Sequence, residues 1–136
     1  MDHILFHKEF FIHSTYEGLN KCLNIVNEIK EMFDLDVDAV FALHTVIVES
    51  VENAFIHGNK GRRESEVRFF ILVNSLEIVI EVEDMGDGFD IDNIPSPSFH
   101  TNIDKEGGRG IYFIKILSDS CSSVGRGNII RIKLKR

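Results

Sequence analysis

Hydrophobic and polar positions along the chain follow two periods, and their order predicts the elements of the fold. Apolar and β-branched residues favour strands in four stretches: Leu5 to Ile12, Val67 to Val73, Ile78 to Val82 and Asn128 to Leu134. Apolar residues recur at helical spacing in three others: Leu19 to Phe33, Val40 to Gly58 and Ile111 to Leu117. The two middle strands are close in sequence, so a hairpin is expected there. The simplest packing is an α+β fold, a two-layer α/β sandwich with three main helices on one face of a mostly antiparallel sheet.

The two longer predicted helices carry end signals. Ser14 with Glu17 three residues later has the form of a capping box, in which side chains satisfy free backbone amides. Asp36 or Asp38 is suited to cap the second helix, and Gly58 is suited to end it. Both helices are therefore expected to have defined limits.

Length and cysteine content limit the class of protein. At 136 residues we expect one domain, 1–136, since two would each be near the lower limit for an adequate core. No apolar stretch approaches the roughly 20 residues of a membrane span, and the start lacks the pattern of a signal peptide. Cys22 and Cys121 are too few for a disulfide framework. A reduced, cytoplasmic protein is the expectation.

Charge is negative overall but uneven along the chain. The formal net charge of −7 argues against direct nucleic-acid binding. The last stretch, Arg126 to Arg136, instead carries basic residues without an acid. We interpret this tail as a solvated edge strand, because charges on edge strands discourage aggregation, and a patch that binds a partner is the alternative.

A line of polar residues runs along the second predicted helix. Glu49, Asn53 and His57 are spaced by four, so they stack on one face, roughly opposite the apolar stripe. By itself this pattern also fits an ordinary surface helix. His57 and the nearby Asn59 either end the helix at the surface or line a site. Two further motifs bear on the choice.

The second motif follows a strand. Asp84 ends the buried-looking run Ile78 to Glu83, and Gly86, Gly88 and Phe89 come after it. A turn between strands would explain an aspartate with glycines. A carboxylate held at a strand end can also accept a hydrogen bond from an exocyclic amino group, such as that of adenine, while the glycines let the base approach the backbone.

The third motif is glycine-rich and precedes the third predicted helix. Gly107, Gly108 and Gly110 leave backbone amides unhindered at a helix N-terminus, where an anion binds. A flexible hinge is the alternative. The helix end contributes only about 0.3 to 2 kcal/mol, whereas micromolar binding needs roughly 8 kcal/mol. A triphosphate would therefore also require base contacts, a metal and a cation such as Arg109 or Lys105.

Taken together, the three motifs resemble the N, G1 and G2 boxes of the GHKL ATPase superfamily of gyrase, chaperone, histidine kinase and mismatch-repair ATPases, with its Bergerat fold. More narrowly, the helix Val48 to Ala54 with Ile56-His57-Gly58, and the run Glu106 to Ile111, resemble the single-domain anti-sigma factor serine/threonine kinases. The resemblance extends from about Phe6 to Leu134, nearly the whole chain.

The resemblance implies a set of roles in binding ATP and Mg²⁺. Asn53 would coordinate magnesium, and Glu49 would be the general base that deprotonates the acceptor. Asp84 would read the adenine amino group. The remaining implied binding residues are His57, Gly86, Gly88, Phe89, Lys105, Gly107, Gly108, Arg109, Gly110 and Ile111. The segment Pro95 to Glu106 would be a lid. Some relatives carry arginine where this chain has Glu106, so Arg109 or Lys105 would supply the cation for the γ-phosphate.

The same resemblance implies protein partners. It favours a serine/threonine kinase that binds a sigma factor and phosphorylates a STAS-type antagonist. A homodimer that pairs through the strand Phe6 to Ile12 is a further expectation, although core packing explains Phe10 and Phe11 of this strand equally well. An ATP-responsive binding module without phosphotransfer is the alternative. A hydrolysing ATPase or the catalytic half of a histidine kinase is less favoured, because the chain has no room for a dimerisation hairpin. The remaining hypothesis is a globular domain that binds no nucleotide and whose three motifs arose by chance.

Overall fold

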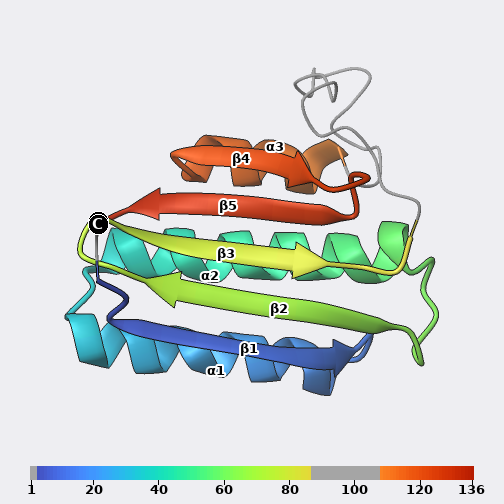
Figure 1. The fold of residues 1–136 in the computed structure, drawn as a ribbon, viewed down its shortest axis with the longest axis horizontal. Helices are drawn as coiled ribbons and strands as arrows, with labels where there is room; N and C mark the ends of the chain where they lie inside the picture. The colour runs from blue at the N-terminus through green and yellow to red at the C-terminus, as the bar shows by residue number, and fades with distance from the viewer. Residues whose placement is uncertain (1–2, 87–107) are drawn as a thin grey trace.

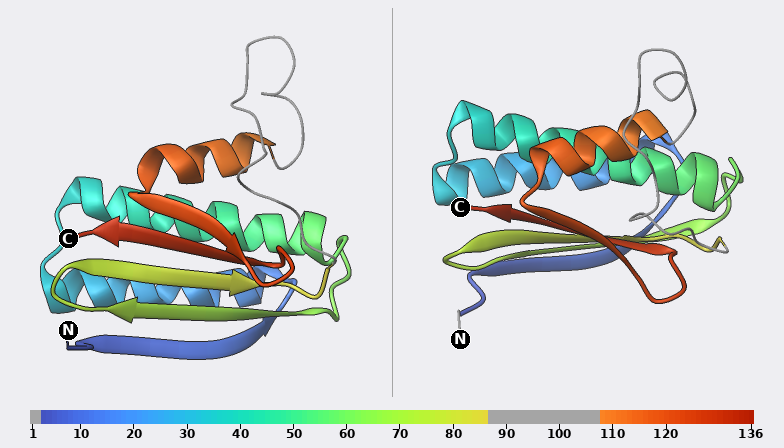
Figure 2. Two further views of the ribbon diagram at one scale, coloured as in Figure 1. Left: turned by 45° about the horizontal axis from the view of Figure 1, so that its top comes forward. Right: turned by 90° about the horizontal axis from the view of Figure 1, so that it is seen from above.

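A computed structural model describes residues 3–86 and 108–136 of the chain. The strands of this part are β1 (Phe6–His13), β2 (Glu66–Val73), β3 (Glu77–Glu83), β4 (Ser120–Val124) and β5 (Ile129–Lys135). The helices are α1 (Tyr16–Phe33), α2 (Val37–Asn53) and α3 (Gly108–Leu117), and a π-helical turn, η1 (Ala54–Gly58), continues α2. Every strand of the described sheet pairs antiparallel, in the order β1-β2-β3-β5-β4 (Figure 1). The helices cover one face of the sheet, as the view from above in Figure 2 makes plain, so the predicted two-layer α+β fold is confirmed.

The helices begin at polar caps, although one predicted cap is wrong. Thr15, not Ser14, caps α1, and its side chain accepts a hydrogen bond from the amide of Gly18. Ser14 is engaged elsewhere, because its hydroxyl donates to the carbonyl of Ser65 at 3.2 Å. Asp36 caps α2, because its side chain accepts a hydrogen bond from the amide of Ala39 at 2.7 Å. Asp36 was one of the two caps predicted for this helix.

The core lies between the helices and the sheet. One face of each central strand is apolar and buried, including Phe69 and Ile71 on β2 and Ile80 on β3. The facing helices contribute Ile29 of α1 and Ile47 of α2, both fully buried. Burying apolar surface stabilises a fold by about 25 cal/mol per Å², so this layer is the main source of stability. Its rigid packing fixes where the ends of α2 and β3 lie.

The hydropathy of α2 has a structural explanation. Val37–Gly58 has the length and apolar composition of a membrane span, contrary to the expectation that no stretch would. In this fold the stretch is the central core helix, and it contacts the sheet, α1 and α3. Core packing therefore accounts for its apolar composition.

The C-terminal half of the sheet differs from the prediction. β5 lies between β3 and β4, so the basic tail is an inner strand and the solvated-edge interpretation is wrong. The edge on this side is β4, Ser120–Val124, which the sequence pattern did not predict. The opposite edge is β1, where the expected strand from Phe6 to Ile12 is confirmed.

The sheet face opposite the helices carries charge. The guanidinium of Arg68 donates to Glu83 at 2.8 Å, to Glu9 at 2.9 Å and to Glu81 at 3.0 Å. Arg131 of β5 donates to the second oxygen of Glu81 at 2.7 Å. These contacts cross four neighbouring strands, β1, β2, β3 and β5, and form one network that we call the open-face network.

Candidate functional site: a polar cavity between α2 and α3

The polar line on α2 is less exposed than a surface helix would leave it. Asn53 is only 7% exposed, and Glu49 and His57 are half-buried. The reason is α3, which packs against this part of α2. Glu49, Asn53 and His57 line one cavity that Gly110 of α3 also lines. An ordinary surface helix would leave this face open to solvent, whereas here α3 partly covers it.

A small cavity brings the first and third motifs together. It has a volume of about 80 Å³, and its lining includes Glu49, Asn53 and His57 from the α2–η1 segment and Gly110 from the first turn of α3. A Cβ at position 110 would lie 2.7 Å from Oε2 of Glu49. A side chain at position 110 would therefore displace the Glu49 carboxylate from its present place, whereas glycine leaves the first turn of α3 open toward the cavity.

Asn53 provides a direct test of whether a ligand fits. Among the buried side-chain atoms of the described residues, its Nδ2 has no hydrogen-bond partner. A buried donor without a partner costs about 1 to 3 kcal/mol, so native structures rarely keep one without reason. An anion in the cavity would accept from Nδ2, while Oδ1 of the same amide is the kind of oxygen that Mg²⁺ accepts. The residues present fit a magnesium-bound polyphosphate.

The second motif lies at the end of β3 and is held on several sides. Asp84 is 5% exposed, and its Oδ1 accepts from the amide of Gly86 at 2.7 Å. Asn128, just before β5, donates from Nδ2 to the carbonyl of Asp84 at 2.9 Å, and its own carbonyl accepts from the Asp84 amide at 3.0 Å. The side chain of Arg126 donates twice to the carbonyl of Gly86, at 3.1 and 3.2 Å. The carboxyl group therefore has a fixed place.

Burial raises the pKa of the Asp84 carboxyl above its ordinary value. The amide of Gly86 and the charge of Arg126 act in the opposite direction, and Glu83 adds to the increase. A carboxylate that is costly to bury benefits from a ligand that donates a hydrogen bond to it. An exocyclic amino group is a donor of this kind.

The first motif, which ends at Gly58, and the second motif, which begins at Asp84, are in direct contact. A Cβ at Gly58 would overlap the carboxyl group of Asp84, and a Cβ at Gly86 would overlap the carbonyl oxygen of Gly58. Both positions therefore require glycine for space rather than for an unusual φ angle. The end of η1 and the end of β3 pack backbone to backbone, which joins the cavity beside Asn53 to the carboxyl of Asp84.

The remaining predicted residues are placed as follows. Ile111 is 1% exposed and belongs to the hydrophobic core, so only its backbone is available to a ligand. Gly108 and Arg109 are the first two residues of α3, and only their backbone belongs to the described structure. The other predicted binding residues and the predicted lid lie outside the described residues, namely Gly88, Phe89, Lys105, Gly107 and the segment Pro95 to Glu106.

Four further residues join the site without having been predicted. Glu52 and Ile56 line the small cavity, and Arg126 and Asn128 hold the Asp84 segment. The place of Glu52 could have been predicted from the sequence, since it lies three residues after Glu49 on the same helix. The places of Arg126 and Asn128 could not, because 40 and 44 positions separate these residues from Gly86 and Asp84, which they hold.

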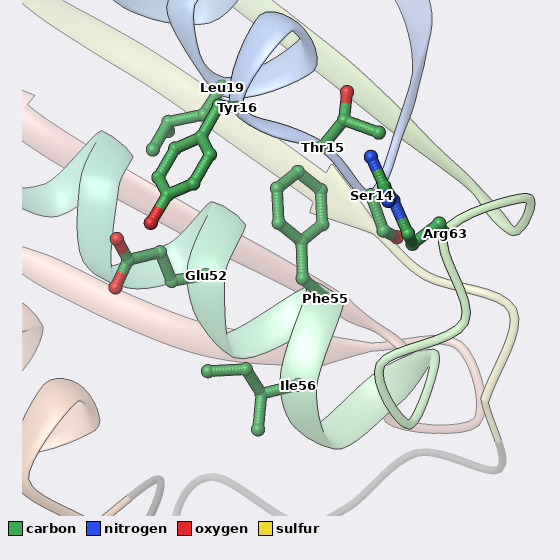
Figure 3. Close-up of a pocket in the computed structure, with 8 residues that line it drawn as sticks. All are labelled: Ser14, Thr15, Tyr16, Leu19, Glu52, Phe55, Ile56 and Arg63. Carbon is green, nitrogen blue, oxygen red and sulfur yellow. The ribbon is translucent and has the colours of Figure 1, made fainter.

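A larger cavity of about 550 Å³ adjoins the small one, and Glu52 and Ile56 line both. Its walls come from the start of α1, from the end of α2 with η1, and from the loop before β2 (Figure 3). The lining residues are Ser14, Thr15, Tyr16, Leu19, Glu52, Phe55, Ile56 and Arg63. Tyr16 and Ile56 are exposed large side chains, at 85% and 51%. The small polar cavity thus opens beside a more apolar surface.

The antiparallel sheet, the helices on one face and the polar cavity at the end of α2 are the features to compare with known nucleotide-binding ATPase domains. A family model for the histidine kinase-like ATPase domain matches residues 12–134, and the chain belongs to this family. The predicted resemblance to the GHKL superfamily is confirmed.

Curated relatives narrow the comparison. The chain is similar to the anti-sigma F factor of Clostridium beijerinckii (strain ATCC 51743 / NCIMB 8052), with 29% identity over 107 residues that cover 75% of each chain. It is also similar to the anti-sigma F factors of Clostridium botulinum strains Eklund 17B / Type B and Alaska E43 / Type E3, each 26% identical with the same coverage.

Proposed function

We propose that this protein is an ATP- and Mg²⁺-dependent anti-sigma regulator with serine/threonine kinase activity. It would bind a sigma factor, phosphorylate a STAS-type antagonist and so control the availability of the sigma factor in the cytoplasm. The names of the relatives and the GHKL family support this reading. A homodimer through the β1 edge stays a prediction.

One observation carries the proposal: the buried Asn53, whose Nδ2 has no hydrogen-bond partner among the described residues, lines a cavity together with Glu49 and the first turn of α3. Bound magnesium would neutralise phosphate charge, and Asn53 would hold it. Glu49, one helical turn earlier, would accept the proton of the attacking serine hydroxyl. Asp84 would accept a hydrogen bond from the adenine amino group. Phosphoryl transfer depends mainly on such positioning and charge stabilisation.

The exposed surface beside the small cavity supports a protein acceptor. The larger cavity shares Glu52 and Ile56 with the site of Asn53, and its rim includes the exposed Tyr16. Exposed aromatic and apolar residues near a polar cavity are typical of surfaces that contact proteins. This adjacency also fits the alternative, an ATP-responsive regulator that binds partners without transferring phosphate.

The test is calorimetry of ATP binding with and without magnesium, on wild type, Asn53→Ala and Asn74→Ala. We expect magnesium-dependent binding in wild type, and a loss of at least about tenfold in affinity in Asn53→Ala. Asn74 is the matched control, because its side chain accepts from the amides of Leu76 and Glu77 at the opposite end of β3. Its variant should bind as wild type does.

The kinase step is tested separately with ATP labelled at the γ-phosphate and STAS-type proteins encoded in the same genome. Glu49→Gln should keep ATP and partner binding while transfer falls by about a hundredfold or more. Binding of ATP and partners by wild type without transfer to any of these proteins would select the regulatory module. A wild type that binds no ATP would overturn the proposal as a whole.

A further inference from the structure

Asn59, which follows η1, is among the most buried polar residues of the described chain, with 1% exposure. Its side-chain amide is fully used. Oδ1 accepts from the amide of Met85 at 2.8 Å. Nδ2 donates to the carbonyl of Glu66 at 3.1 Å and to the hydroxyl of Ser14 at 3.3 Å. This amide therefore joins the loop after β3 to the starts of β2 and α1.

Met85 belongs to the segment that carries Asp84, so its contact with Asn59 bears on the position of the Asp84 carboxyl. Met85 lies between Asp84 and Gly86, whose backbone groups are already held from the β5 side by Asn128 and Arg126. Asn59 holds the same segment from the side of the helices, because it directly follows η1 and, through it, α2. Two sets of side chains therefore fix the segment from opposite sides.

A nucleotide in this site would span both parts. Its phosphates would lie near Asn53, whereas its base would reach Asp84. The distance between those two residues is then a determinant of binding, since a shift of about 1 Å away from productive geometry has large effects. The polar link between them runs from the α2–η1 segment through Asn59 to Met85. Gly58 and Gly86 add only packing, which resists approach but not separation.

We propose that Asn59 is a positioning residue that sets the Asp84 carboxyl against the phosphate-binding end of the cavity, and that it thereby determines selectivity for adenine. The inference rests on the proposed function, because it takes Asp84 as the group that reads the base. Asn59 itself touches no ligand. Its amide acts through the backbone of Met85.

The experiment measures the affinities of Mg·ATP and Mg·GTP, and hence their ratio, in wild type, Asn59→Ala, Asn59→Asp and Asn74→Ala. In Asn59→Ala we expect the preference for ATP to fall about tenfold, as GTP loses less affinity than ATP. Asn59→Asp keeps an acceptor for the Met85 amide and should retain most of the preference. Asn74→Ala removes a comparable amide far from the site and should leave the ratio unchanged.

A double-mutant cycle separates positioning from general stability. If Asn59 acts through Asp84, the variant Asn59→Ala should change the ratio little once Asp84→Asn is present, so the two effects will not add. A role in stability alone would weaken ATP and GTP by the same factor and leave the ratio as in wild type. That result, with ATP binding intact in wild type, would overturn this inference and leave the proposed function standing.

Two other outcomes also decide the question. A wild type that binds ATP without preferring it to GTP would overturn the selectivity role, though not ATP binding. Failure of both Asn59→Ala and Asn59→Asp to fold would overturn the positioning role as well, because the amide would then serve the whole fold.

Discussion

Asp84 is the residue at which stability and function are in conflict. It is buried, and burial raises the pKa of its carboxyl above the ordinary value of 3.8. The folded protein therefore holds the proton at a pH where the unfolded chain has released it. By linkage, the contribution of this group to stability falls as pH rises through the two pKa values. Above the folded pKa, the native state carries the full cost of a buried charge.

Replacing this carboxylate by a neutral amide should therefore separate the two properties. Asp84→Asn keeps an Oδ1 for the Gly86 amide. We therefore expect its free energy of unfolding at neutral pH to equal or exceed that of wild type. The gain relative to wild type should grow as pH rises from the ordinary pKa of an aspartate through the raised pKa of the folded state. Preference for ATP over GTP should fall about tenfold or more, because the base loses a charged acceptor.

Denaturant titrations at several pH values, with nucleotide competition on the same samples, check both parts of this prediction. Asn128→Ala is a useful comparison, since it removes the hydrogen bond to the carbonyl of Asp84 without altering the carboxyl. It should lower stability at every pH. A variant Asp84→Asn that loses stability at neutral pH would contradict the account of a costly buried charge.

What the sequence could predict at this scale depended on local spacing. Glu49 and Asn53 are four positions apart on one helix, so their shared face was readable. Asn128 and Arg126 were not predictable, because they reach Asp84 and Gly86 only through the pairing of β3 with β5. The burial of Asn53 was missed for the same reason: it depends on α3, which is far along the chain.

Among the elements, the four strands joined by the open-face network make the clearest electrostatic unit. Burial alone would lower the pKa of Arg68, but hydrogen bonds to Glu83, Glu81 and Glu9 outweigh burial and raise it. Burial would raise the pKa of Glu81, and its bonds to Arg68 and Arg131 instead lower it. Both side chains are only 16% exposed, so solvent screens this pair less than a surface pair.

We expect Arg68→Met to destabilise the protein by about 2 kcal/mol at neutral pH, because Glu9 and Glu83 lose the cation that Arg68 provides and Glu81 keeps only Arg131. The pKa of Glu81 in the folded protein lies below the ordinary value of 4.5. Its contribution is therefore complete above that value and is lost as pH falls through the folded pKa. The difference between wild type and variant should shrink on acidification.

Urea unfolding at neutral and acidic pH measures this difference. Lys8→Met is the matched control, since it removes the Lys8–Glu28 pair, whose side chains are 43% and 44% exposed. Exposed pairs contribute about 0 to 1 kcal/mol, so its effect should be small at every pH. Equal losses in the two variants would contradict the special weight given to the open-face network.

Element boundaries show where sequence patterns stop being informative. β4 reads Ser-Cys-Ser-Ser-Val and contains too few apolar residues to alternate visibly, so it was missed. The basic residues of β5 suggested an edge, whereas Arg131 pairs with Glu81 of a neighbouring strand. The capping box failed because Ser14 bonds across to Ser65 and Asn59, contacts that only the folded chain creates.

At the scale of the whole molecule, the candidate site joins both layers. Asn53 and Glu49 belong to the helical layer, and Asp84 ends a central strand of the sheet. A ligand that contacts both layers binds the folded chain and not the unfolded one, so it must stabilise the fold by mass action. At a concentration about 100 times the dissociation constant, the gain is roughly 2.7 kcal/mol.

For a domain of this size, that gain should raise the melting temperature by about 10 °C when Mg·ATP is added. Asn53→Ala should show little of this increase. Its melting temperature without ligand should still equal or exceed that of wild type, because the removed amide has a buried donor without a partner among the described residues. A lower melting temperature in the unliganded variant would mean that Asn53 serves the fold, and the loss of ATP binding would then carry no information about magnesium. Thermal unfolding with ATP, with magnesium and with both therefore decides whether this buried amide is kept for a ligand or for the core.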